Sequence, residues 1–155
     1  MDTIHLLAFP DRMSIRTAMF NDLSSPAALL STRRSGKPRD MIAPGPDADE
    51  MADILSTASR VPDHGKLAPW RFVVVGADRR DALSALLVDA YRAEKPDAGR
   101  LEIEAMAQFA HQAPALVVVL SAPVAGSKIP LWEQELSAGV ACMQLLNAVH
   151  ARGFV

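Results

Sequence analysis

The sequence predicts a domain in which helices cover a mixed or parallel β-sheet. Two kinds of segment support this fold class. Short apolar runs, rich in valine, make up most of residues 71–75 and all of residues 115–120, and longer segments around them carry apolar side chains at helical spacing. Valine-rich runs without alternation are typical of strands that are buried on both faces. The 155 residues, half of them apolar, are enough for one domain with a substantial core.

The first helix is expected near the start of this domain. Residues 1–20 show no clear hydrophobic period, so we expect a loose extension there and a domain over residues 21–155. A short helix is predicted from Ser25 to about Arg33, because Pro26 suits its first turn. A stretch rich in turn residues then separates this helix from the next one.

The remaining elements follow from hydrophobic spacing and from capping residues. They are a helix capped by Asp47 or Asp49 that ends near Arg60, a strand over residues 71–75, a helix from an N-cap at Asp78 to about Ala93, a helix over residues 98–112, a strand over residues 115–120, and a helix from Leu131 to about Arg152. Gly153 lies where a glycine commonly ends a helix.

The last predicted helix has an unusual composition. From Ala138 to Val149 it is apolar or small nearly all round, so we expect it to be buried on every side. Cys142 on this helix is expected to be an inert core thiol. Acidic residues at its start, such as Glu133, suit the positive end of the helix dipole.

The amino-acid composition indicates the cellular compartment and excludes some classes of binding partner. The single cysteine excludes an intrachain disulfide, which fits a reducing compartment. No apolar run reaches the length of a membrane span and the N-terminus has no basic leader, so we expect a cytoplasmic protein with no membrane partner. The formal net charge of −2 argues against a generally basic nucleic-acid binder.

A basic segment follows the first predicted helix. It contains Arg33, Arg34, Lys37 and Arg39. Arginine suits bidentate phosphate contacts and Ser35 adds a hydroxyl, so one interpretation is a phosphate-binding loop. The other is a solvated basic turn at the C-terminal end of a helix, where positive charge is favourable. The residues alone leave both open.

A second candidate is the stretch R-V-P-D-H-G-K at residues 60–66. In one interpretation Asp63 closes a plain turn. In the other, Pro62 and Gly65 shape a ligand-facing loop that presents His64. The sequence shows no dinucleotide-binding glycine motif after a strand, no Walker A motif, no His/Cys spacing of a metal site and no nucleophile elbow. We therefore predict neither a metal site nor a side-chain nucleophile.

Three motifs in order resemble the nitroreductase family, in particular its compact branch of small NAD(P)H nitroreductases. They are T-R-R-S after a leucine-rich helix, R-V-P-D-H-G-K-L-A-P-W-R-F-V-V-V, and I-P-L-W-E-Q-E-L-S-A-G, within a likeness from roughly Leu29 to Phe154. The resemblance implies an α+β fold, a three-layer sandwich in which helices flank a mixed, mainly antiparallel sheet. It also implies that this chain is truncated, because the family's C-terminal strands and arm would follow Phe154.

The resemblance implies an intertwined homodimer with FMN at the subunit interface. The flavin-binding positions that it marks are Arg33, Arg34, Ser35, Lys37, Arg60 and His64. The first three match the stretch that binds the flavin phosphate. The last two match positions that reach the flavin held mainly by the partner subunit, and the lysine lies where some relatives have a basic residue near the flavin ring. No side chain is implied as an obligatory catalytic acid or base.

The implied activity is transfer of hydride from NAD(P)H, through FMN, to nitroaromatic or quinone-like acceptors. One alternative is a non-catalytic relative that dimerises without flavin. Another is a polyanion binder that uses the basic segment, which predicts salt-dependent binding to oligonucleotides. Bound flavin distinguishes the first interpretation from both alternatives.

Overall fold

The computed structural model of the chain describes residues 20–155, which form two compact units. The first contains helix α1 (Pro26–Thr32), and the second covers Ser35–Val155. The expected loose extension over residues 1–20 lies, but for its last residue, outside the described part of the chain.

Helix α1 lies within the predicted bounds, Ser25 to about Arg33, and hydrogen bonds cap both of its ends. Ser25 Oγ accepts a hydrogen bond from the backbone N–H of Ala28 at 3.1 Å, and Pro26 occupies the first turn. At the other end, the backbone N–H of Arg33 donates to the carbonyl oxygen of Leu29 at 2.8 Å. Arg33 therefore caps the helix and starts the basic segment.

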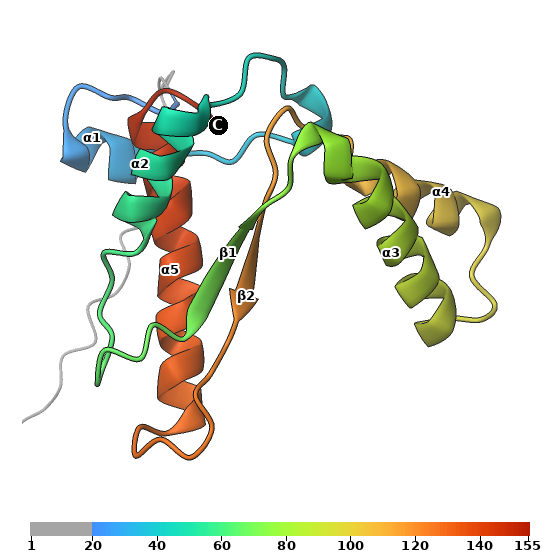
Figure 1. Cartoon of the computed structure of the whole chain (residues 1–155). Helices are drawn as coiled ribbons and strands as arrows, with labels where there is room; N and C mark the ends of the chain where they lie inside the picture. Colours follow the sequence, from blue (N-terminus) through green and yellow to red (C-terminus); the bar gives the residue numbers. More distant parts are fainter. Residues whose placement is uncertain (1–19) are drawn as a thin grey trace, which may run out of the picture. The chain divides into compact units, whose positions relative to one another are not determined.

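The second unit mixes helices with a small sheet. In chain order it contains the short 3₁₀ helix η1 (Pro38–Asp40), α2 (Ala48–Ala58), β1 (Trp70–Val74), the 3₁₀ helix η2 (Ala77–Arg79), α3 (Arg80–Glu94), α4 (Arg100–Phe109), β2 (Val117–Ser121) and α5 (Leu131–Ala151). Helix α5 packs against α2 and both strands, whereas α3 and α4 pack against each other (Figure 1). The predicted α+β class and the predicted order of helices and strands are confirmed.

Strands β1 and β2 pair antiparallel, with Phe72 opposite Val119. This antiparallel pairing agrees with the mainly antiparallel sheet that the resemblance to the nitroreductase family implies. These two side chains pack against the hydrophobic core, whereas Val73, Val74 and Leu120 are 43, 48 and 46% exposed. The expectation of strands buried on both faces is therefore wrong for the described chain, because a single helix, α5, packs along the pair.

The core lies along one side of α5. Its two clusters of buried residues are Ile54, Ala58, Leu145 and Ala148, and Trp70, Ala138 and Ala141. The small side chains come from α2 and α5 and allow close packing. Trp70 is 7% exposed and packs in the second cluster.

Within the second unit, residues 35–155, no element covers the other side of α5. Its exposed large apolar residues are Leu131, Trp132, Leu136, Val140, Met143 and Leu146. A Cβ atom added at Gly139 would meet nothing within 4 Å, and Cys142 is exposed. The predictions of a helix buried on every side and of a core thiol are thus wrong for the described chain, because α2 and the strands occupy only one side of α5.

In the second unit, two of the three residues that are predicted to begin or end a helix do so. Asp47 caps α2 and forms a reciprocal capping box with Glu50, as one of the predicted alternatives required. Gly153 has a φ of +82° and ends α5, since its N–H donates to the carbonyl oxygen of His150 at 2.9 Å. The predicted N-cap at Asp78 is wrong: this residue lies inside η2, and α3 begins at Arg80.

Candidate functional site

The basic segment begins at the end of α1, in the first unit. The backbone N–H of Arg34 donates to Asn21 Oδ1 at 2.8 Å. Its guanidinium carbon lies 5.6 Å from the centre of the Phe20 ring, within the range of a cation–π contact. Arg33 is half-buried and Arg34 is exposed. The backbone of this corner is thus anchored, and it presents two guanidinium groups.

The segment continues into the second unit with Ser35 and Lys37, which are both exposed. Arg39 follows in η1 and lies 3.9 Å from the carboxylate of Asp40, with 72% of its side chain exposed. Guanidinium, ammonium and hydroxyl groups in one short stretch form a donor set that suits a phosphate group.

The loop between α2 and β1 is tightly organised. The carboxylate of Asp63 accepts hydrogen bonds from the backbone N–H groups of Leu67 at 3.2 Å and Ala68 at 2.7 Å, which confirms that Asp63 closes a turn. Gly65, Lys66 and Ala68 have φ values of +80°, +54° and +45°. Such a backbone costs a non-glycine residue about 1–3 kcal/mol, so surrounding contacts hold this loop in its shape. Strain of this kind is common at binding sites.

His64 lies in this loop and pairs with a residue from α5. Its Nδ1 atom is 2.7 Å from Glu133 Oε1. The side chain of His64 is 64% exposed and that of Glu133 is 31% exposed. Glu133 lies in the first turn of α5, which is why its charge has a simple explanation in the helix dipole. No local signal predicts this pair, because 69 residues separate its members.

Arg60 lies at the start of the same loop, directly after the residue that caps the end of α2. Its side chain is exposed. The α2–β1 loop therefore carries two of the six predicted flavin-binding residues, and the basic segment carries the other four. In the structure these residues lie at the end of α1 and on loops, and their contacts with flavin stay a prediction.

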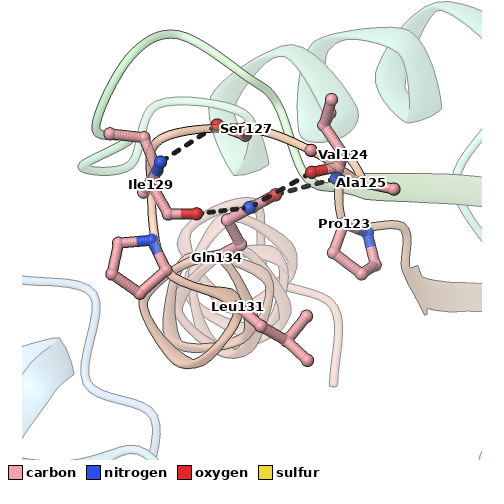
Figure 2. A pocket seen from close by; sticks show the side chains of 9 residues that line it. Pro123, Val124, Ala125, Ser127, Ile129, Leu131 and Gln134 are labelled. Atoms are coloured by element: carbon pink, nitrogen blue, oxygen red, sulfur yellow. Dashed lines mark hydrogen bonds between the residues drawn. The ribbon is translucent and has the colours of Figure 1, made fainter.

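A cavity of about 340 Å³ lies beside the start of α5. Figure 2 shows the side chain of Gln134 among its walls, between Val124 and Ile129. Gln134 is 4% exposed; its Oε1 accepts a hydrogen bond from the backbone N–H of Val124 at 2.8 Å, and its Nε2 donates to the carbonyl oxygen of Ile129 at 2.9 Å. The buried amide thus ties the preceding loop to α5. None of the predicted flavin-binding residues lines this cavity.

A second cavity, of about 370 Å³, lies between the start of α2 and the ends of the strands. Its walls include Asp47, Met51, Gly76, Arg80 and Leu116, and again none of the predicted site residues. Within residues 20–155, no group of three or more potential metal-binding side chains comes together. The helices in this part of the chain are all too short or too polar to cross a membrane.

Comparison with known proteins identifies similar chains. A model of the nitroreductase family matches residues 30–155, a range that includes all six predicted flavin-binding residues. A Haemophilus influenzae protein named "Putative NAD(P)H nitroreductase" is 39% identical over 127 residues, which cover 81% of this chain and 67% of that protein. "Putative NAD(P)H nitroreductase YdjA" of Escherichia coli K12 is 34% identical over 126 residues, with the same two coverages.

Proposed function

The chain belongs to the nitroreductase family, and on this premise we propose that it is an FMN-dependent oxidoreductase, which uses NAD(P)H to reduce nitroaromatic or quinone-like acceptors. The observation that carries the proposal is the family match over residues 30–155, which spans both the basic segment and the loop of His64. When bound, FMN accepts hydride from NAD(P)H and passes electrons to the acceptor. The protein supplies binding, orientation and charge.

The donor set of the basic segment fits the phosphate of FMN. Two guanidinium groups can each form paired hydrogen bonds to phosphate oxygens, and a hydroxyl can donate another. In the proposed complex Arg33, Arg34 and Ser35 hold the phosphate. Lys37, which is exposed, adds a positive charge that we place near the flavin ring. Arg60 and His64 reach the flavin that the partner subunit holds.

A homodimer is part of this proposal, and the uncovered side of α5 supports it. The exposed side chains of Trp132, Leu136, Val140 and Met143 follow one another at helical spacing. Apolar residues that gather on one helix face mark an interaction surface. The open space around Gly139 would let another helix approach closely. We further propose a cytoplasmic location, which fits the single cysteine.

The test is an absorbance spectrum of the purified chain, recorded after addition of FMN and exhaustive dialysis. We expect a retained visible flavin band that NAD(P)H bleaches and that a nitroaromatic or quinone restores. A folded but colourless protein would contradict the proposal and favour the non-catalytic alternative. Binding of an oligonucleotide that weakens steeply with salt, without flavin retention, would instead favour the polyanion binder.

A further inference from the structure

The pair of His64 and Glu133 joins two segments that are far apart in sequence. The Nδ1 atom of His64 lies 2.7 Å from Glu133 Oε1, a short distance for a hydrogen bond between a ring nitrogen and a carboxylate. The histidine side chain is 64% exposed. Surface pairs of this kind contribute little to stability, so stability alone does not explain why the pair is held so closely.

Both partners are held in place by their surroundings. On the histidine side, Asp63 binds two backbone N–H groups of its own loop, and a Cβ atom added at Gly65 would lie 3.3 Å from the side chain of Ile129. On the glutamate side, Gln134 is its neighbour in sequence and binds the carbonyl oxygen of the same Ile129 at 2.9 Å. Ile129 is thus a neighbour of both segments, and Figure 2 shows its carbonyl oxygen bonded to Gln134.

The contact determines which histidine nitrogen is left for a ligand. An ionised carboxylate only accepts hydrogen bonds, so Nδ1 must carry the hydrogen that Glu133 accepts. The other ring nitrogen, Nε2, has no hydrogen-bond partner among residues 20–155. In a neutral imidazole it is therefore a hydrogen-bond acceptor with a fixed direction, and in the protonated ring it is a donor with the same direction.

We propose that Glu133 is a positioning residue for His64: it holds the ring and its Nδ1–H tautomer, so that Nε2 is the atom offered to the bound flavin. This inference rests on the proposed function, in which His64 contacts FMN. Glu133 itself touches neither flavin nor substrate in this proposal. It acts through the histidine, as partners of ligand-binding histidines do at metal sites.

The first test reads the tautomer without any cofactor. The full chain is labelled with ¹⁵N-histidine, and a long-range ¹H–¹⁵N spectrum is recorded at pH 8, where an ordinary imidazole is neutral. His64→Ala identifies the signal among the four histidines. We expect the Nδ1–H form in the unmodified chain and, in Glu133→Ala, the Nε2–H form that a solvated histidine side chain favours. Glu133→Gln should give a mixture, because an amide can either accept from Nδ1–H or donate to Nδ1.

The second test is a double-mutant cycle on FMN affinity. We expect Glu133→Ala to weaken FMN binding about three- to tenfold, the effect of one lost hydrogen bond. The same change in a His64→Ala background should have no effect, because Glu133 acts through the histidine. The matched control is Glu135→Ala, which removes the same charge from an exposed position of the same helix and should leave FMN affinity unchanged.

An unchanged tautomer in Glu133→Ala would overturn the inference, as would a loss of FMN affinity that persists in the His64→Ala background. Failure of the proposed function gives a different result, in which the unmodified chain binds no flavin at all. The tautomer spectrum alone then decides whether Glu133 positions His64.

Discussion

Arg80 donates a hydrogen bond from Nη1 to the carbonyl oxygen of Ala110, thirty residues further along the chain, at 2.6 Å. Its guanidinium also donates to the carbonyl oxygens of Val75 at 3.0 Å and Pro114 at 3.3 Å. The residue is 7% exposed. One side chain thus connects the end of β1, the end of α4 and the segment before β2.

Replacement of Arg80 by methionine should lower the free energy of unfolding by about 2–4 kcal/mol. The change keeps most of the apolar stem but leaves several carbonyl groups without a charged donor in a buried site. Urea unfolding followed by circular dichroism measures the loss. Arg79→Met is the control, because Arg79 is exposed and its replacement should change stability by less than about 0.5 kcal/mol. Equal stabilities of the two variants would contradict this role of Arg80.

Glu102 on α4 makes the free energy of unfolding depend on pH in the acid range. The hydrogen bond from the Lys95 ammonium is the largest of the causes that lower the pKa of Glu102 from 4.5 to about 2. Because the folded state has the lower pKa, this stabilisation is present above about pH 4.5 and is lost as the pH falls towards 2. Glu102→Gln should therefore flatten the dependence of unfolding free energy on pH over this range.

Two side chains that donate hydrogen bonds to Glu102 lower its pKa by different amounts. The hydroxyl of Tyr91 also donates to Glu102, at 3.0 Å, and contributes less than the ammonium of Lys95. Lys95→Met should therefore flatten the acid dependence more than Tyr91→Phe does. Urea titrations at a series of pH values compare the two variants, and the reverse order would contradict the assignment.

Gly153 should resist replacement, whereas Gly139 should tolerate it. Gly153 has a φ of +82°, so Gly153→Ala should cost about 1 kcal/mol. Gly139 lies inside α5 with nothing within 4 Å of an added Cβ, so Gly139→Ala should stabilise the isolated chain by about 0.5–1 kcal/mol through helix propensity. Thermal unfolding at concentrations where the chain is monomeric measures both. A stabilising Gly153→Ala would show that the strained turn is absent in solution.

Leu136 tests the proposed dimer. Its side chain is 61% exposed on the uncovered side of α5. Leu136→Glu should shift the chain towards monomer, because a dimer through this face would bury the new carboxylate without a partner. Light scattering after size exclusion measures the mass. Leu86→Glu is the control, since Leu86 is 64% exposed but belongs to α3. If only the control dissociated the dimer, the α5 face would not be its interface.

Arg33 tests the phosphate assignment. Arg33→Ala should weaken FMN binding by about 1.5–3 kcal/mol, the value of a hydrogen bond to a charged group. Riboflavin, which has no phosphate, should bind the variant and the unmodified chain equally. Arg39→Ala is the matched control, because Arg39 is 72% exposed in the same basic segment and has no assigned contact with flavin. Unchanged FMN affinity in Arg33→Ala, measured by fluorescence quenching, would rule out the phosphate contact.

The candidate site could be predicted in part. The motifs around Arg33 and His64 identify the family, and the family match confirms that identification. The flavin contacts of these residues stay predictions. Glu133 could not be found as a partner of His64, because a helix dipole already accounts for an acidic residue in that turn.

The sequence by itself determined the features that depend on neighbouring residues. Ser25 and Asp47 cap their helices and Gly153 ends the last one, because each hydrogen bond joins residues within one turn. Asp63 closes its loop for the same reason. Hydrophobic spacing likewise predicted the order of the helices and strands.

Only the tertiary structure decided which distant groups meet and which apolar surfaces stay open. His64 meets Glu133, and Arg80 collects carbonyl oxygens from three separate segments. The same composition that predicted residues 138–149 of α5 to be buried on every side instead leaves Val140 and Met143 exposed. The hydrophobicity of a segment indicates how much of its surface favours burial. Which part of that surface is covered depends on how the other helices and strands pack against it.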